Sequence, residues 1–175
     1  MSSDLPVPRP GRAALAFVFV TVTLDMLAFG VIVPVLPHLI RELVGGDLAT
    51  ASRWSGVFGT VFALAQFACS PIQGALSDRF GRRPVILLSN LGLAIDFALM
   101  ALAWSLPLLF LGRVISGVTA ASISTANAYI ADVTPPDKRA GAFGMLGAAF
   151  GIGFVLGPAL GSLLSTIDLR APFWG

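Results

Sequence analysis

The sequence predicts an all-α integral membrane protein, and three observations lead to this class. Of its 175 residues, 56% are hydrophobic and only 11% are charged, whereas soluble globular domains carry about 25% charged residues. The mean hydropathy of +0.88 agrees with this deficit. The apolar residues form long uninterrupted runs, and the alternating pattern of a membrane barrel is absent. The chain has too little polar surface to cover a water-soluble body.

Five apolar runs are long enough to cross a bilayer as helices, which takes about 20 residues each. They cover about 13–40, 54–75, 85–104, 106–130 and 140–167. A backbone in lipid must satisfy its own hydrogen bonds, so each run is expected to be helical. The first run is too long for the apolar core of a cleaved signal peptide. Residues 1–12 are expected to form a polar cytoplasmic segment, and residues 171–175 to open a sixth span.

The distribution of basic residues predicts the orientation. The N-terminal segment and the second and fourth connections hold seven of them: Arg9, Arg12, Arg79, Arg82, Arg83, Lys138 and Arg139. The opposite side holds three: Arg41, Arg53 and Arg170. Because cytoplasmic connections are enriched in Lys and Arg, the N-terminus is expected in the cytoplasm.

The densest charge cluster lies in the short second connection, where residues 74–84 read GALSDRFGRRP. This cluster has a simple interpretation as a topology signal, but such a signal needs only Lys or Arg. Asp78 can also accept hydrogen bonds at a nearby helix start, and Gly81 permits a reversal of direction. Pro84 suits the first turn of the next helix. We therefore expect a loop that holds a particular shape against a partner.

Three charged residues lie inside apolar runs: Asp25, Asp96 and Arg113. A charge at mid-bilayer costs about 2.5–3.5 kcal/mol on the insertion scale, so these side chains should face one another or a water-filled cavity. The acids are proton carriers, ligands for a cationic substrate, or paired structural groups. Arg113 biases or pairs with the acids, or anchors its span by reaching toward the interface. Gln66, in the second run, contacts substrate or joins helices.

The fifth run is rich in glycine, which lets helix backbones approach closely. Its glycines are Gly141, Gly144, Gly147, Gly151, Gly153, Gly157 and Gly161. Pairs four residues apart, including Gly147 with Gly151, are expected to form one smooth face. Pro158 adds an expected kink. Such a helix serves either plain packing or a hinge between moving parts.

Other chemistries find no support in the sequence. The chain has one cysteine, Cys69, and one histidine, His38, so it offers neither an internal disulfide nor a metal-ligand cluster. No nucleophile–base–acid set or phosphate-cradling loop is present, so an enzyme is not expected. The basic residues form no single stripe, which argues against nucleic acid as a partner.

Several motifs resemble those of one transporter family. The spacing Gly74-x-Leu76-x-Asp78-Arg79-x-Gly81-Arg82-Arg83 resembles the loop signature of the major facilitator superfamily. Arg113-x-x-x-Gly117 resembles its fourth-span motif, with Ser116 where a glutamine is often found. Gly153-x-x-x-Gly157-Pro158-x-x-Gly161 resembles the motif of its antiporters, with Ser162 in place of a final glycine.

Four longer stretches are similar to the tetracycline/proton antiporter group of that superfamily: TVTLDMLAFGVIVPVLP, AQFACSPIQGALSDRFGRRPV, GLAIDFALMA and NAYIADVT. The resemblance runs from about Thr21 to Phe173. It implies a helical bundle in which two six-helix halves surround a cavity. The chain would be the N-terminal six-helix half, truncated in the sixth span, and its missing partner would be the C-terminal half.

The resemblance also implies a function. A proton gradient across the inner membrane would drive export of a drug, such as a tetracycline carried with Mg²⁺, by alternating access; no cofactor besides the coupling proton is implied. Asp25 and Asp96 would matter for transport, Arg113 for proton coupling, and Gln66 for substrate contact. The remaining expected roles are a gating loop (Gly74, Asp78, Arg79, Gly81, Arg82, Arg83) and a hinge or seal (Gly153, Gly157, Pro158, Gly161). The alternatives are a transporter of another solute and a non-transporting remnant.

Overall fold

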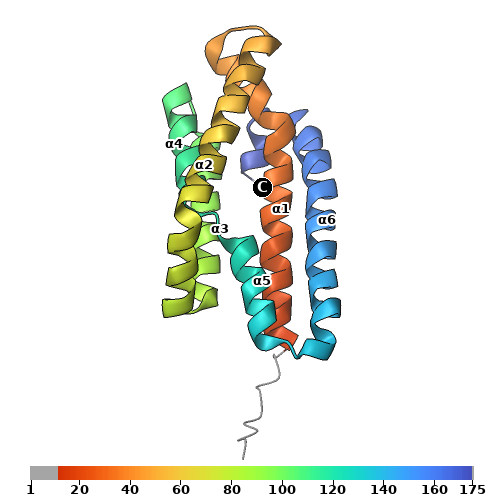
Figure 1. Ribbon diagram of the computed structural model, residues 1–175. Coiled ribbons are helices and arrows are strands. Elements are labelled where there is room, and N and C mark those ends of the chain that lie inside the picture. The colour runs from red at the N-terminus through yellow and green to blue at the C-terminus, as the bar shows by residue number, and fades with distance from the viewer. Residues whose placement is uncertain (1–11, 175) are drawn as a thin grey trace, which may run out of the picture.

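A computed structural model describes residues 12–174, which fold into a bundle of helices (Figure 1). Its elements are α1 (Arg12–Val44), α2 (Leu48–Phe80), α3 (Arg82–Ala101), α4 (Leu106–Thr119), α5 (Ser122–Val133), the 3₁₀ turn η1 (Pro136–Lys138), α6 (Arg139–Ser165) and the 3₁₀ turn η2 (Ala171–Phe173). This part of the chain contains no strand, as the composition predicted. The expected polar segment lies outside the described residues, apart from Arg12.

Five segments of the described chain are long and apolar enough to cross a membrane. α4 and α5 together make one of them, and η1 with α6 makes another. The second span is longer at both ends than the predicted 54–75. It starts early because the Asp47 carboxylate caps α2 by accepting the Thr50 N–H at 2.8 Å. Hydrogen bonding from Thr50 lowers the pKa of Asp47 below its usual value.

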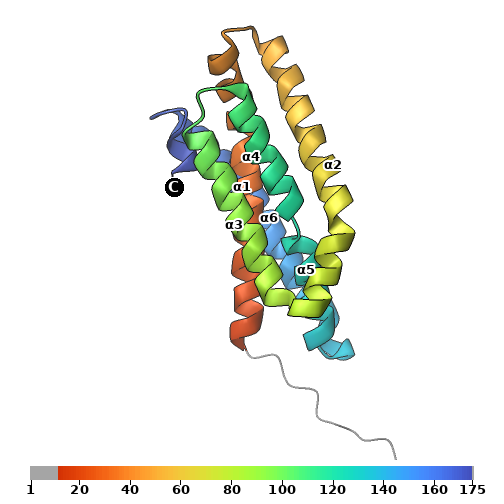
Figure 2. The same cartoon turned by 90° about the vertical axis from the view of Figure 1, so that its left-hand side faces the viewer.

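The helices fall into two groups, which are joined by α5 and by direct contact between α1 and α2. α2, α3 and α4 pack together, and α1 packs along α6. α5 crosses between the groups and contacts α1, α3 and α6 (Figures 1 and 2). Residues 171–175 were expected to open a sixth span; here Phe173 is buried and packs edge-on against Phe97, with ring centroids 5.5 Å apart.

Two apolar cores lie along α1, one toward each end of the bundle. The first gathers buried side chains from most helices around Leu39, Phe58 and Met100. The second is formed by α1, α5 and α6 around Val18 and Ile130. On α1 the first core begins near Val31 and the second ends at Met26. Asp25 therefore lies near the boundary between the cores, where polar side chains from other helices meet it.

α1 and α6 touch backbone to backbone through glycine. A Cβ added to Gly157 would lie 2.5 Å from the Leu27 carbonyl oxygen and 2.7 Å from the Gly30 Cα. Gly153 and Gly161 meet the α1 backbone in the same way. The expected hinge or seal residues of α6 thus pack against the backbone of α1, where Pro158 contacts Gly30.

The expected single smooth glycine face was wrong, because the glycines of α6 divide between two faces. Four of them would meet nothing within 4 Å on gaining a Cβ: Gly141, Gly144, Gly147 and Gly151. The pair Gly147 and Gly151 therefore lies on an open face, away from the buried glycines that contact α1.

The predicted loop at 74–84 was also wrong, because α2 continues through Asp78 and Arg79 to Phe80. The connection shrinks to Gly81, which has a φ of +94°. A side chain is strained in that region of backbone space, so glycine permits this abrupt junction. Asp78 does not cap α3; its carboxylate pairs with Arg82, one turn further along, at 2.6 Å. Pro84 lies in the first turn of α3, as expected.

The predicted uninterrupted helix over 106–130 was wrong as well. Helical structure stops at Thr119 and resumes at Ser122, so α4 and α5 are separated by Ala120 and Ala121. Neighbouring helices approach this point closely: a Cβ on Gly117 would lie 2.6 Å from the Phe62 carbonyl oxygen. The break places unpaired backbone groups within reach of side chains from α2 and α3.

Candidate functional site

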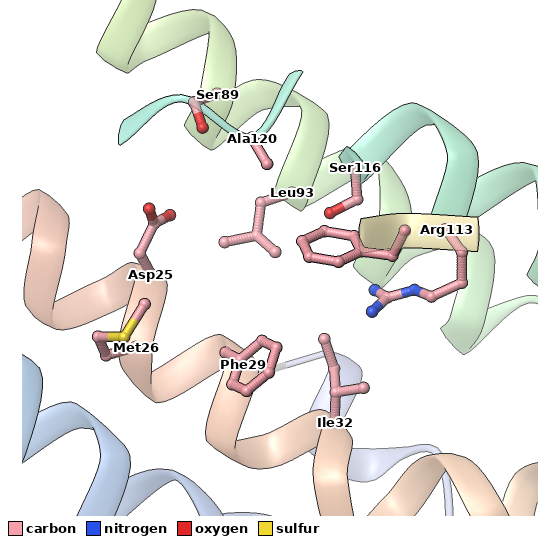
Figure 3. A pocket seen from close by; sticks show the side chains of 10 residues that line it. Asp25, Met26, Phe29, Ile32, Ser89, Leu93, Arg113, Ser116 and Ala120 are labelled. Atoms are coloured by element: carbon pink, nitrogen blue, oxygen red, sulfur yellow. The ribbon is translucent and has the colours of Figure 1, made fainter. Parts of the chain in front are cut away.

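A pocket with mostly apolar walls and a few polar side chains lies at the break between α4 and α5 (Figure 3). It encloses about 60 Å³, enough for a few water molecules. Its lining comes from α1 to α4 and the break: Asp25, Met26, Phe29, Ile32, Phe62, Ser89, Leu93, Arg113, Ser116 and Ala120. Figure 3 shows Asp25 and Arg113 approaching the pocket from opposite sides. The pocket thus brings together two of the charged residues singled out in the sequence.

Asp25 is half-buried on α1, next to two serine hydroxyl groups that are linked to each other. Ser122, the first residue of α5, donates a hydrogen bond to its carboxylate. The Ser122 oxygen also lies 2.9 Å from the Ser89 oxygen. Ser89 in turn accepts the Ala121 N–H at 3.2 Å. No cation pairs with Asp25 among the described residues.

Asp96 is held differently. Its side chain is fully buried and its carboxylate forms an ion pair with Arg113, whose side chain is only 5% exposed. The Arg113 Nε also donates to Asp96 at 3.3 Å, and the guanidinium lies 5.7 Å from the centroid of the Phe62 ring. A buried pair of this kind is neutral as a unit, and each partner removes the cost of burying the other. The two sequence-predicted acids therefore occupy distinct environments.

Gln66 joins helices here. Its amide donates to the Ala120 carbonyl at 3.3 Å, and Gln73, on the same helix, donates to the Val118 carbonyl. Both carbonyls lie at the break, where the helix supplies fewer partners of its own. Gln73 was not among the residues predicted from the sequence; its position seven residues after Gln66 on one helix was the available signal.

Replacing Gln73 with leucine is expected to destabilise the bundle by about 1–3 kcal/mol, because the Val118 carbonyl would be buried without its donor. The check is a thermal unfolding curve in detergent. Asn127→Leu is the matched control, since the Asn127 amide bonds to Ile123 of its own helix and is exposed. Equal melting temperatures for the two variants would contradict this role for Gln73.

Two residues of the 74–83 signature, Asp78 and Arg82, form an ion-pair cluster at the end of the bundle where α2 meets α3. Arg82 joins three groups: Asp78 at 2.6 Å, the Ser77 hydroxyl at 2.6 Å and Asp132 of α5 at 3.1 Å. The sequence analysis did not single out Asp132, which lies within the quoted stretch NAYIADVT.

The other members of the signature stand apart from this ion-pair cluster. Arg79 and Arg83 lie over the rings of Phe80 and Phe17, each 5.3 Å from the centroid. Gly74 faces open space. The cluster therefore ties the start of α3 to the ends of α2 and α5.

Comparisons with known proteins agree with this architecture. The sequence profile of the Major Facilitator Superfamily matches residues 18–175. The class C tetracycline resistance protein of Escherichia coli is 50% identical over 160 residues, which are 91% of this chain and 40% of that protein. The class E protein of Escherichia coli is 46% identical over 165 residues, 94% of this chain and 39% of that protein.

A solved structure is similar as well. The crystal structure of the human organic anion transporter MFSD10 (TETRAN) matches with a TM-score of 0.76 and 29% identity, covering 98% of this chain and 44% of that one. The chain spans about two-fifths of the length of the tetracycline resistance proteins it matches. These relatives are membrane transporters, which confirms the expectation that the chain is not an enzyme.

Proposed function

Since the chain belongs to the Major Facilitator Superfamily and is close to the tetracycline efflux proteins, we propose that it forms the N-terminal bundle of a proton-driven drug exporter. Its drug is a tetracycline carried as a complex with a divalent metal such as Mg²⁺. The partner is a C-terminal half, and the transporter lies in the inner membrane with its N-terminus in the cytoplasm. Membership in the family and the helical bundle support this proposal.

One observation carries the proposal. Among the described residues, Asp25 in the pocket has no cation partner, whereas Arg113 in the same pocket is already paired with Asp96. Asp25 can take up a proton or a positively charged ligand without breaking an ion pair. Asp96 can do so only by leaving a buried Arg113 charge unpaired, which is costly. We therefore assign proton or substrate exchange to Asp25 and assign Asp96 and Arg113 to a fixed supporting pair.

The metal is treated as part of the cargo. Asp25 is the acid that lines the pocket, and one carboxylate can supply one oxygen ligand. Mg²⁺ is held by few protein carboxylates when other oxygen ligands come from water or substrate. A drug chelate would supply such ligands, and its net positive charge would complement Asp25.

Alternating access requires this bundle to move against the C-terminal half, with the substrate bound between the two. Binding in transporters of this kind occurs near the membrane midplane, where broken helices line the site. The α4–α5 break and Asp25 provide this arrangement. The Asp78–Arg82–Asp132 cluster closes the cytoplasmic end by holding α2, α3 and α5 together, and it opens when the other half moves.

The test joins this chain to the C-terminal part of the class C relative and measures proton-driven tetracycline uptake into inverted membrane vesicles. The chimera is expected to transport tetracycline. Its Asp25→Asn variant is expected to reduce uptake to the level of empty vesicles, because the asparagine amide cannot take up and release a proton as a carboxylate does. Asp137→Asn is the matched control, since Asp137 is exposed on η1.

The 175-residue chain alone is expected to give no uptake, because one bundle encloses no complete passage. Full transport by Asp25→Asn would overturn the role of Asp25. Failure of the unaltered chimera with every drug tried would favour a non-transporting remnant.

Organic anions form a second substrate class, favoured by the similarity to MFSD10 over nearly the whole chain. The same vesicles distinguish the classes when they are offered organic anions without divalent metal. Metal-dependent uptake of tetracycline supports the first class, and metal-independent anion uptake supports the second.

A further inference from the structure

We propose that Ser122 and Ser89 are positioning residues that stabilise the charged form of Asp25 and couple its protonation state to the structure of the α4–α5 break. This inference rests on the proposed proton-coupled function. It names two side chains and a backbone junction that no motif in the sequence marked.

The donors in this chain of groups must all point toward Asp25. Ser122 has one hydroxyl proton, and it is donated to the Asp25 carboxylate. The 2.9 Å contact between the serine oxygens therefore uses the Ser89 proton, since each hydroxyl donates once. The Ser89 oxygen then accepts the Ala121 N–H. Counting protons in this way gives one ordered relay, Ala121 N–H to Ser89 to Ser122 to Asp25.

An ordered relay of this kind favours the carboxylate over the carboxylic acid. Hydrogen bonds to a charged acceptor are about twice as strong as neutral ones, and bonds in series polarise one another. When Asp25 binds a proton, the last bond loses its charged acceptor. Each bond upstream is weakened in turn, as far as the Ala121 N–H.

The relay ends at the structural break, which gives it a mechanical consequence. Ala121 is the residue before α5, and Ser122 is its first residue. The start of a helix also carries partial positive charge, which complements a nearby carboxylate. Charged Asp25 thus holds the start of α5 against α1 and α3. Protonated Asp25 releases that hold, so proton binding would loosen the junction between the two helix groups.

Few other charges face Asp25, so the relay has little competition. Arg113, from α4, is the other charged side chain that lines the pocket, and it is paired with Asp96 of α3. α2 contributes Phe62 to the lining, and the described residues of α5 and α6 add no charged group to it. The Ser122 hydroxyl bonds directly to Asp25, and Ser89 acts through Ser122.

The first experiment measures hydrogen–deuterium exchange in the 175-residue chain, in lipid nanodiscs, at the Ala121 amide and the first turn of α5. Ser122→Ala and Ser89→Ala are expected to speed exchange there about tenfold, the equivalent of one lost hydrogen bond. Asp25→Asn is expected to speed exchange less at neutral pH, because the amide oxygen still accepts from Ser122 but carries no charge. Ser122→Thr keeps the hydroxyl and should restore protection.

Thr21→Val is the matched control. Thr21 lies one turn before Asp25 on α1, and its hydroxyl bonds only to carbonyls of its own helix, those of Phe17 and Val18. It is expected to leave exchange at the α5 start unchanged. If Thr21→Val speeds exchange as much as Ser122→Ala, general loosening explains the result and the relay is wrong.

The second experiment follows the pH dependence of uptake by the chimera, which a purely structural role would not move. Without the Ser122 bond, Asp25 holds its proton more tightly. It then releases the proton only when the pH on the cytoplasmic side of the membrane is higher. The pH of half-maximal uptake is expected to rise by about one unit in Ser122→Ala, and to rise less in Ser89→Ala.

The two experiments separate the relay from the transport proposal. Unchanged exchange in Ser122→Ala and Ser89→Ala would overturn the relay even if the chimera transports. Faster exchange in the serine variants of the 175-residue chain, together with a chimera that transports nothing, would keep the relay and remove the proposed function. An unchanged pH profile in an active Ser122→Ala chimera would overturn the link to the proton.

Discussion

Gly157→Ala is expected to lower the unfolding free energy of the bundle by about 3 kcal/mol, a large effect for one methyl group. The new Cβ would lie 2.5 Å from the Leu27 carbonyl oxygen and 2.7 Å from the Gly30 Cα. Both obstacles are backbone atoms, which cannot rotate away as a side chain can. α1 and α6 would have to separate along the contact that fixes their spacing. Thermal unfolding in detergent, followed by circular dichroism, measures the loss.

Gly147→Ala makes the same chemical change on the open face of α6, where a Cβ meets nothing within 4 Å. Alanine is favoured over glycine inside a helix by about 0.5–1 kcal/mol, so this variant should melt slightly above the unaltered protein. The melting temperature is therefore expected to fall in Gly157→Ala and to rise slightly in Gly147→Ala. Similar melting temperatures would mean that the α1–α6 contact is looser than described.

Arg113→Met is expected to cost about 3–5 kcal/mol, because it leaves the Asp96 carboxylate charged and alone in a site with no solvent exposure. Asp96→Leu should cost a similar amount by stranding the guanidinium. The double variant, Asp96→Leu with Arg113→Met, should recover most of the loss, since an apolar pair of similar size can replace a buried ion pair. Denaturant titration of all four proteins completes the cycle.

The cycle is informative because its terms should be far from additive. Residues in direct contact couple by about 0.5–3 kcal/mol or more in such measurements. If the double variant lost the sum of the single losses, the two side chains would be acting independently and the ion pair would carry no stability. Arg82 with Asp78 offers a comparison: Asp78 is 67% exposed, so breaking that pair should matter far less.

Much of the fold follows from composition and run length, because a lipid-embedded backbone has few alternatives to helices. The presence of five long apolar helical segments and the membership of a transporter family were predicted correctly, although the second segment is longer than expected and the fourth is broken. The helix break was missed because its partners are distant in the chain. Gln66 donates to a carbonyl 54 residues away, and Gln73 to one 45 residues away. Hydropathy reports how apolar a segment is and says nothing about such pairing.

The candidate site was predicted in part. The cost of burying charge identified Asp25, Asp96 and Arg113 without a structure. The choice of which acid pairs with Arg113 depends on how α1, α3 and α4 rotate about their axes, and run length carries no such information. Ser89 was missed for a related reason: serine is common at helix contacts and gains meaning only beside Ser122.

The α1–α6 contact has a practical consequence for studying motion. Helices that touch through their main chains are held at a spacing that no side-chain rotation can change, so a rearrangement that keeps this contact keeps that spacing. Spin labels placed on the outer surfaces of α1 and α6 would therefore keep one distance in every state that preserves the contact. That pair would serve as an internal ruler, against which the displacement of every other helix in the protein could be calibrated.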